Sequence, residues 1–269
     1  MLRVLQLLAV FCLLGFQAVE AQIDWPDGRR AAVVLTYDDG IDTHLDNAFA
    51  DLKEFNLKGT FYVTGSSTSL RQRMDEWREL AQAGNELGNH TLFHPCLSDT
   101  GTDKREWVKP EQDLKNYSVS RIIEEIRVAN TLLEAVDGEA ARTYAYTCVD
   151  MTAGGQSFVE GLAGEFEFAR GGGEKLTTDS ETLDFFRVPS WSVTGMDGSE
   201  MIGLVKNAVE RGGFLVLMFH GVGGEYLSVS REAHRELAEY LQQNRGEIWN
   251  DTFLNVMEYL KSQRNDASR

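Results

Sequence analysis

Two histidines four residues apart and two adjacent aspartates are the residue types from which a metal centre can be built. His90 and His94 lie in "NHTLFHP", and Asp38 and Asp39 lie in "TYDDG". An i, i+4 histidine pair is a common metal-ligand spacing, although alone it is a weak signal. Two neutral imidazoles and one carboxylate are the usual protein ligands of a catalytic zinc site, which leaves positions for water and substrate. We therefore predict that one of the paired aspartates joins the two histidines around a divalent cation.

The other aspartate and His220 are candidates for proton transfer. A bound metal lowers the pKa of water from about 15.7 to about 7, and a carboxylate beside the ligands is placed to accept the proton as a general base. Alternatively, this carboxylate orients a ligand histidine. His220 ends the apolar run Leu215–Phe219 and precedes glycine-rich sequence suited to a loop. It is either a core histidine or an imidazolium that protonates a leaving amine or alkoxide.

The segments that must position these residues alternate between strand-like and helix-like patterns. Strands are predicted at 31–37, 59–65, 85–90, 143–148, 165–171, 185–191 and 212–220. Helices are predicted at 45–55, 70–83, 122–137, 155–163, 200–211, 231–243 and 251–262, with an excursion loop at 98–117. Repeated strand–helix units predict a parallel α/β sheet covered by helices, either a barrel or an open doubly wound sheet.

The positions of the reactive side chains favour a barrel over an open sheet. The carboxyl ends of the predicted strands carry Asp38, Asp39, His90, His94, Cys148, Trp191 and His220. Such ends converge at one mouth of a (β/α) barrel, so we predict a barrel with fewer strands than the usual eight. Asp42 and His44 follow the paired aspartates and either extend the site or are solvated loop residues. His234 lies on a highly charged, exposed-looking helix and receives no functional role.

Composition predicts one domain, and the N-terminal segment predicts that it is exported. The 269 residues are 42% hydrophobic and 25% charged, which suits a single large globular domain. Residues 1–21 combine Arg3, the apolar segment "LLAVFCLLGF" and small residues at the cleavage position, which is typical of a signal peptide. An uncleaved anchor is the alternative. We expect residues 22–269 to form the functional domain, secreted or periplasmic and away from the membrane after cleavage.

Charge and cysteine content restrict the partners and the compartment. The net charge of −16 disfavours a nucleic acid partner, because an acidic surface repels phosphate. Two cysteines, Cys96 and Cys148, remain after removal of the signal peptide. In an oxidising compartment two cysteines suggest one disulfide, and two unpaired thiols are the alternative.

Three segments together resemble a known family. "TYDDG", "NHTLFHP" and the strand ending in "MFH" are similar, in order and spacing, to the first, second and fifth motifs of the polysaccharide deacetylases, the NodB-like carbohydrate esterase family 4. The resemblance extends over about residues 31–260. It implies a distorted (β/α) barrel and metal-dependent removal of N-acetyl or O-acetyl groups from a glycan. It also implies that Asp38 is the general base, that Asp39, His90 and His94 are the metal ligands, and that His220 is the general acid.

The resemblance is weaker in the third and fourth motifs. The third motif of the family reads Arg-x-Pro-Tyr, whereas the matching strand here is "RTYAYTC" and has no proline. The identity of the arginine that supports Asp38 is therefore open, and the candidates are Arg142 and Arg187. Trp191 either forms a wall of the acetyl pocket or fills the barrel core.

The same resemblance implies further roles near the site. A backbone amide near Cys148 shares the oxyanion charge with the metal, and a Cys96–Cys148 disulfide fixes the metal-binding loop. Zinc is favoured by ligand type, and Co²⁺, Ni²⁺ or Mn²⁺ suit the same ligands. Two alternatives remain: a glycan-binding barrel without catalysis, and a metal amidohydrolase that acts on another substrate.

Overall fold

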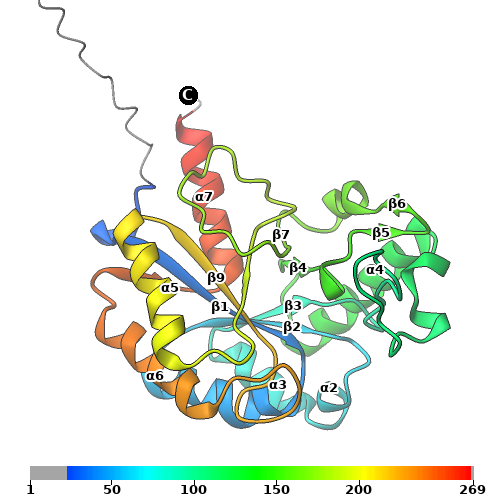
Figure 1. Ribbon diagram of the computed structural model, residues 1–269, viewed down its shortest axis with the longest axis horizontal. Coiled ribbons are helices and arrows are strands. Elements are labelled where there is room, and N and C mark those ends of the chain that lie inside the picture. Colours follow the sequence, from blue (N-terminus) through cyan, green and yellow to red (C-terminus); the bar gives the residue numbers. More distant parts are fainter. Residues whose placement is uncertain (1–22, 268–269) are drawn as a thin grey trace, which may run out of the picture.

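The computed structural model describes residues 23–267, arranged around a parallel sheet (Figure 1). The predicted signal peptide, residues 1–21, lies outside the described residues. Among those that are described, no helix is both long and apolar enough to cross a membrane. The sheet runs in the order β7-β4-β3-β2-β1-β9-β8, with β10 paired to β1. The strands are β1 (Ala31–Asp39), β2 (Gly59–Val63), β3 (Glu86–Asn89), β4 (Tyr144–Ala145), β7 (Ala169–Arg170), β8 (Trp191–Ser192), β9 (Phe214–Phe219) and β10 (Ile248–Asn250).

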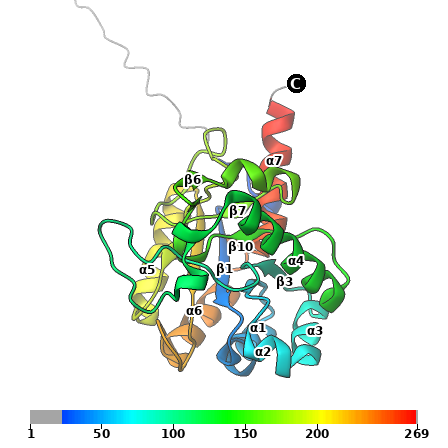
Figure 2. The same ribbon diagram turned by 90° about the vertical axis from the view of Figure 1, so that its right-hand side faces the viewer.

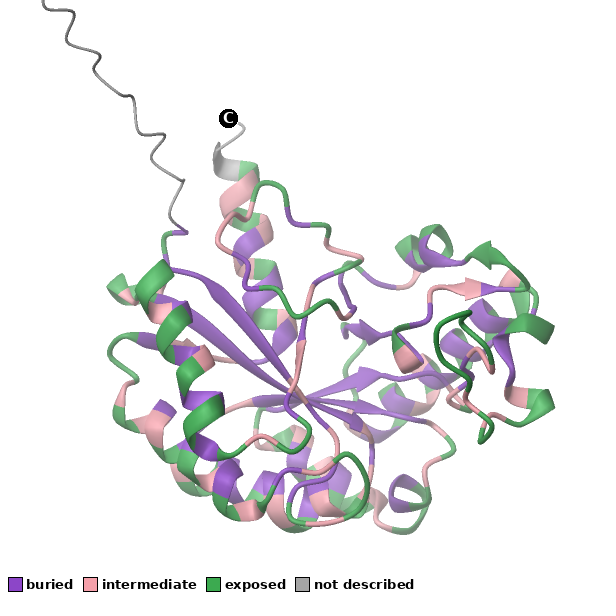
Figure 3. Cartoon of the chain, in the orientation of Figure 1, coloured by how far each residue is buried: buried purple, intermediate pink, exposed green. Residues whose placement is uncertain are grey.

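Helices cover both faces of this sheet, and the predicted distorted (β/α) barrel is confirmed. In the side view of Figure 2, β1 lies in the middle of the molecule. Residues of α3, α5 and α6 share one core cluster with β1, whereas α7 packs in a second cluster. The central strands β1, β2, β3 and β9 are largely buried, whereas the helices expose their outer faces (Figure 3). The helices are α1 (Phe49–Phe55), α2 (Thr68–Gln72), α3 (Met74–Gln82), α4 (Val119–Asp137), α5 (Gly198–Arg211), α6 (Arg231–Gln243) and α7 (Phe253–Ala267).

Strand β1 is buried on both faces, which explains its continuous apolar sequence. Val33 and Leu35 pack into the core cluster that includes α5 and α6, whereas Ala32 and Val34 pack against α7. The parallel register pairs Asp39 with Val63 of β2, and Val63 with Asn89 of β3. Because these strands end at one level, the residues at and just after their ends are brought together.

Two local predictions are wrong. The predicted helix 155–163 is helical only in its second half: β5 (Thr152–Ala153) and β6 (Gln156–Ser157) form an antiparallel hairpin, and a 3₁₀ helix, Val159–Gly164, follows. The hairpin turn consists of Gly154 and Gly155, which both have positive φ, as the tight two-residue turn requires. The predicted strand at 185–191 is reduced to its last residue, because β8 spans only Trp191–Ser192.

The interpretation of His234 as exposed is also wrong. Its side chain is fully buried between α6, β1 and α1, and it forms part of a polar chain. The hydroxyl of Tyr37 lies 2.8 Å from Nε2 of His234, and Nδ1 of His234 lies 2.9 Å from a carboxylate oxygen of Asp51. Arg235 donates to the other Asp51 oxygen at 2.8 Å. The charged helix α6 therefore buries one polar network that ties it to α1 and to the central strand.

We expect Asp51→Asn to lower the free energy of unfolding by about 3 kcal/mol at neutral pH, because it removes the charge from a buried paired carboxylate. Burial alone would raise the pKa of Asp51, but His234 and Arg235 lower it below its ordinary value. The carboxylate therefore stabilises the fold above about pH 4, and this contribution is lost as pH falls through the lowered pKa.

Urea unfolding at pH 7 and at pH 3 measures the difference in the free energy of unfolding between wild type and variant. The matched control is Glu54→Gln, because Glu54 is an exposed partner of the same Arg235. An Asp51→Asn effect as small as that of the control, or one that does not shrink at pH 3, contradicts the prediction.

Candidate active site

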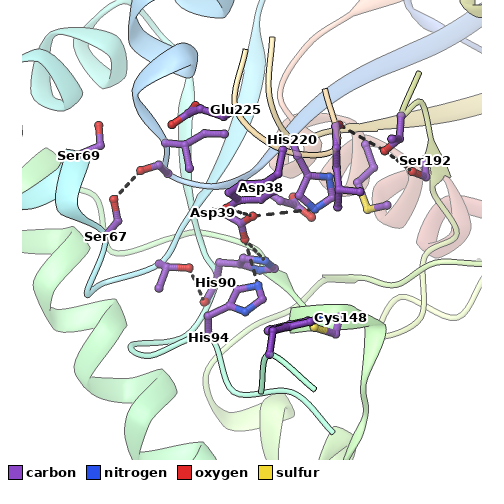
Figure 4. Close-up of a pocket in the computed structure, with 18 of the residues that line it drawn as sticks. Asp38, Asp39, Ser67, Ser69, His90, His94, Cys148, Ser192, His220 and Glu225 are labelled. Carbon is purple, nitrogen blue, oxygen red and sulfur yellow. Dashed lines mark hydrogen bonds and ion pairs between the residues drawn. The ribbon is translucent and has the colours of Figure 1, made fainter. Parts of the chain in front are cut away.

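A cavity of about 1130 Å³ opens at the carboxyl ends of the strands. It collects most of the residues selected from the sequence: its lining includes Asp38, Asp39, His90, His94, Cys148 and His220. Figure 4 shows Asp39 between the two histidines and His220, with Cys148 beside His94. Trp191 is different, because its ring packs against the hydrophobic core while its neighbour Ser192 lines the cavity.

Both adjacent aspartates reach this cavity because the strand geometry breaks at Asp39. Neighbouring side chains of a regular strand point to opposite faces. Asp39, however, has φ of 84°, and Gly40 follows with φ of 66°. Gly40 also leaves no room for a side chain, because a Cβ there would lie 2.8 Å from Val63. The turn at the end of β1 therefore directs both carboxylates into one cavity.

Asp39, His90 and His94 form a candidate metal centre. Their ligand atoms all lie within 4.8 Å of one another. The Oδ1 atom of Asp39 is 3.0 Å from Nε2 of His94 and 3.4 Å from Nε2 of His90. Although burial alone would raise the pKa of Asp39, its contacts with His90 and His94 lower it well below the ordinary value. The carboxylate is thus ionised, as a metal ligand must be.

The hydrogen bonds of His90 and Asp39 fit a cation at this centre. Nδ1 of His90 donates to the carbonyl oxygen of Ala145 at 2.9 Å, so in the neutral ring the lone pair of Nε2 faces Asp39. Oδ1 of Asp39 is buried and accepts no hydrogen bond from the described residues. A lone pair and a carboxylate oxygen that face each other across a few ångströms require a positive charge between them. The donor set of two nitrogens and one oxygen suits Zn²⁺ and its neighbours.

A tyrosine that the sequence analysis missed orients the carboxylate. The hydroxyl of Tyr226 donates to Oδ2 of Asp39 at 2.8 Å, which leaves Oδ1 facing the histidines. Burial, followed by the charge of Asp39, raises the pKa of Tyr226, so the phenol keeps its proton. A hydrogen bond of this kind fixes the orientation of a metal-binding carboxylate. The only sequence signal was its place in the glycine-rich stretch after His220.

Arg170 is the arginine that holds Asp38. Its guanidinium donates to Oδ2 of Asp38 at 2.5 Å and to Oγ of Ser190 at 3.3 Å, and both charged side chains are buried. Oδ1 of Asp38 is buried without a hydrogen-bond partner among the described residues. One carboxylate oxygen is therefore fixed by the guanidinium, and the other is available to accept a proton.

Both arginines proposed from the sequence are wrong for this role. Arg142 pairs with Asp137 at 3.1 Å, and Arg187 pairs with Asp184 at 2.6 Å on the surface. Arg170 lies instead at the end of β7, in "EFEFARG". A cationic residue at the end of a predicted strand was the signal that could have identified it.

The predicted disulfide is present and connects two loops of the cavity. Cys96 and Cys148 are joined, and Nδ1 of His94 lies 3.6 Å from Sγ of Cys96. Cys96 follows β3, whereas Cys148 follows β4, in a turn where its own φ is 54°. The cross-link thus holds the His94 loop against the opposite wall of the cavity.

His44 does not line the cavity but lies buried against the segment that carries His220. It is fully buried, and its Nε2 donates to the backbone carbonyl of His220 at 2.9 Å. Burial lowers the pKa of His44 to about 4, so the ring is neutral at physiological pH. The alternative of a solvated loop residue is therefore wrong for His44. Asp42 does lie at the surface, where it lines the cavity and pairs with Arg73 at 3.2 Å.

Comparisons with known proteins agree with this geometry. The family model "Polysaccharide deacetylase" matches residues 26–153. A peptidoglycan-N-acetylglucosamine deacetylase of Bacillus cereus is 33% identical over 34% of this chain and 33% of its own length. A gellan lyase of a Bacillus species is 23% identical over 91% of this chain and 10% of its own length. The chain thus matches a third or less of the length of these relatives.

Solved structures support the fold. A putative polysaccharide deacetylase of Mycobacterium smegmatis superposes with a TM-score of 0.65 at 17% identity, over 91% of this chain and 94% of that chain. A family 4 acetyl xylan esterase of Clostridium thermocellum in complex with a cobalt ion gives 0.51 at 21% identity, over 86% and 90% of the two chains. The resemblance stated from the sequence is confirmed to this extent: residues 26–153 match the polysaccharide deacetylase model, and the solved structures share the fold.

We expect the purified protein to retain one Zn²⁺ or Co²⁺ per chain after dialysis, and Asp39→Ala and His94→Ala to retain much less. Loss of a ligand weakens binding because fewer donors remain for the cation. Mass spectrometry of the metal content measures this directly. His220→Ala is the control, since His220 lies outside the ligand set, and it should keep the metal. A wild-type protein that is metal-free and whose Tm does not respond to chelators contradicts the assignment.

We expect Arg170→Met to lower kcat on an acetylated substrate by about 100-fold while metal content stays unchanged, because Asp38 loses the group that orients it. The control is Arg187→Met, which removes a surface arginine paired with Asp184 and should leave kcat unchanged. Circular dichroism and metal analysis must show folded, loaded protein for both variants. Full activity of folded Arg170→Met protein would exclude the role.

Proposed function

We propose that this chain is an exported, metal-dependent hydrolase that removes acetyl groups from a carbohydrate. The observation that carries the proposal is that one cavity holds the set Asp39, His90 and His94 together with two further proton-transfer groups, Asp38 and His220. The polysaccharide deacetylase domain of residues 26–153 supports the same reaction class.

The residues of the cavity have separate roles in the proposed hydrolysis. Asp39, His90 and His94 would hold a divalent cation, which would supply a Lewis acid that lowers the pKa of water and stabilises negative charge. Asp38 accepts the proton at Oδ1, while Arg170 holds Oδ2. His220 protonates the leaving amine or alkoxide; its Nε2 lies 4.0 Å from Oδ2 of Asp39, so it faces the metal centre. A backbone amide near Cys148 would share with the metal the negative charge that develops on the carbonyl oxygen of the acetyl group.

Two features support export. Residues 1–21 have the pattern of a signal peptide. The Cys96–Cys148 disulfide persists in an oxidising compartment, whereas cytosolic thiols are kept reduced.

The acidic net charge of −16 disfavours nucleic acid as the substrate and suits a neutral glycan.

We expect the metal-loaded protein to release acetate from at least one member of a panel of acetylated chitin oligomers, peptidoglycan and acetylated xylan. The panel also separates amide from ester substrates. Asp38→Asn should lower kcat by about 10²- to 10⁴-fold, the usual contribution of a general base, without loss of metal. Acetate is measured enzymatically.

Asp184→Asn is the control, because Asp184 is a surface residue paired with Arg187. Binding of a glycan without acetate release from any substrate would favour the non-catalytic alternative. Release of a product other than acetate would favour a different amidohydrolase.

A further inference from the structure

The described residues contain two sets of potential metal ligands, and the candidate active site uses only one of them. The first set is Asp39, His90 and His94, and the second is His94, Cys96 and Cys148. In each set the ligand atoms lie within 4.8 Å of one another. The two sulfurs of the second set are joined as a disulfide, so they are not free to bind a metal as thiolates. His94 belongs to both sets and is the residue through which they can affect each other.

His94 presents a different nitrogen to each set. Its Nε2 lies 3.0 Å from Oδ1 of Asp39, whereas its Nδ1 lies 3.6 Å from Sγ of Cys96. A nitrogen and a sulfur bound to one tetrahedral zinc ion are roughly 3.6 Å apart, given bonds of about 2.0–2.1 Å and about 2.3 Å. Nδ1 and this sulfur therefore already have the separation of two ligands of one cation. The Cα atoms of Cys96 and Cys148 are 5.8 Å apart, so side-chain rotation can bring in the second sulfur once the disulfide is broken.

The proton on the neutral His94 ring allows only one of the two sets to bind a cation at a time. A neutral imidazole carries a proton on one nitrogen and a lone pair on the other. A disulfide sulfur has no hydrogen and can only accept, so in the oxidised protein Nδ1 carries the proton and Nε2 faces Asp39 with its lone pair. When Nδ1 binds a metal, Nε2 carries the proton instead and donates it to Asp39. Such a carboxylate partner is the usual support of a metal-bound histidine.

A reductant can reach the disulfide from the cavity. Cys148 is partly exposed and lines the cavity beside His94 (Figure 4), whereas Cys96 is fully buried. Attack therefore falls on Sγ of Cys148, and Cys96 is the leaving thiolate. The N–H group of His94 lies next to this sulfur and stabilises the charge that develops on it. Exposed disulfides are the ones that thiol–disulfide exchange opens.

We propose that reduction of the Cys96–Cys148 disulfide creates a second metal site, formed by two cysteine thiolates and Nδ1 of His94. A dithiol reductant supplies two electrons: one of its sulfurs attacks Cys148, and the bond to Cys96 breaks. Its second sulfur then displaces Cys148 as the reductant closes into a cyclic disulfide. The two protons of the dithiol pass to the cysteines, and the cation displaces them when it binds. Thiolate ligands favour soft or borderline ions such as Cu⁺ and Zn²⁺.

This thiolate site and the candidate active site exclude each other. A cation on Nδ1 of His94 leaves Asp39 and His90 without their third ligand, so hydrolysis at that centre stops. The existence of the thiolate site does not depend on the proposed deacetylase function; only its effect on acetate release rests on that function. The disulfide then makes activity depend on an oxidising compartment, such as the one to which the proposed export leads.

Binding of Co²⁺ distinguishes the two sites, because cobalt–thiolate bonds give a charge-transfer absorption in the near ultraviolet that nitrogen and oxygen ligands do not give. We expect the oxidised protein to bind one Co²⁺ per chain without this band. After treatment with dithiothreitol and its removal without oxygen, the wild type should bind one Co²⁺ per chain with the band. The control, Cys96→Ser/Cys148→Ser, should bind Co²⁺ without the band in both conditions. A reduced wild type that lacks the band, or that binds two Co²⁺ per chain, overturns the inference.

Two histidine variants test whether the sites share His94. His90→Ala should lose most of its Co²⁺ when oxidised but keep it, with the charge-transfer band, when reduced. Reduced His94→Ala should bind Co²⁺ about ten-fold more weakly than reduced wild type, which corresponds to about 1.4 kcal/mol. Circular dichroism shows whether the reduced proteins stay folded. Equal affinity of reduced His94→Ala and wild type, or loss of the native spectrum on reduction of the wild type, overturns the inference.

Acetate release separates this inference from the proposed function. Reduction of the cobalt-loaded wild type should lower acetate release about ten-fold or more, equivalent to about 1.4 kcal/mol or more, and reoxidation should restore it. Cys96→Ser/Cys148→Ser should not respond to dithiothreitol. A reduced wild type that shows the band and keeps full activity overturns the exclusion of one site by the other. Absence of acetate release in both states would overturn the proposed function alone, because the cobalt measurements do not depend on it.

Discussion

The structure depends on the placement of two adjacent carboxylates at the buried end of the central strand. An ionised carboxylate removed from water is costly unless a partner compensates it. Asp38 is compensated by Arg170 from β7, whereas Asp39 accepts a hydrogen bond from Tyr226 and faces His90 and His94 beyond β3, with which it would hold a cation. Each partner comes from a different strand end, so the parallel register that aligns these ends is a condition for burying the pair at all.

The loop that carries His220 depends on the same end of β1. Three side chains in the segment just after Gly40 hold this loop. His44 donates to the carbonyl oxygen of His220, Asn47 donates to that of Val222 at 2.7 Å, and Thr43 donates to Glu225. The proposed general acid is thus positioned by the residues that follow the proposed general base and metal ligand. Movement of one group shifts the others, which suits a site where proton donor and acceptor must keep a fixed separation.

The sequence predicted those features that depend on local residue patterns. It did not predict features that are determined by contacts between residues far apart in the chain. The parallel α/β class followed from strand–helix alternation, and the barrel from the reactive residues at the strand ends. Residue types and the spacing of His90 and His94 indicated a site with one of the paired aspartates, and the family resemblance selected Asp39. Arg170 was missed because it lies 132 residues from Asp38, and no local pattern reports such a contact. His234 was misplaced because the charges around it suggested a solvated face, whereas the buried partner Asp51 lies 183 residues away. Gly155 was assigned to a helix, although the adjacent glycines Gly154 and Gly155 favour a tight hairpin turn.

Backbone strain in the cavity walls shows what the disulfide contributes. Cys148 and Val149 have φ of 54° and 61°, and His94 has φ of 54°. Positive φ is unfavourable for a β-branched residue such as Val149 and persists only where the surrounding structure imposes it. The Cys96–Cys148 bond and the Arg105–Asp150 pair both act on this turn. Both constraints therefore act on a wall of the cavity. The disulfide holds His94 of the candidate metal centre in fixed relation to Val149, which lines the same cavity.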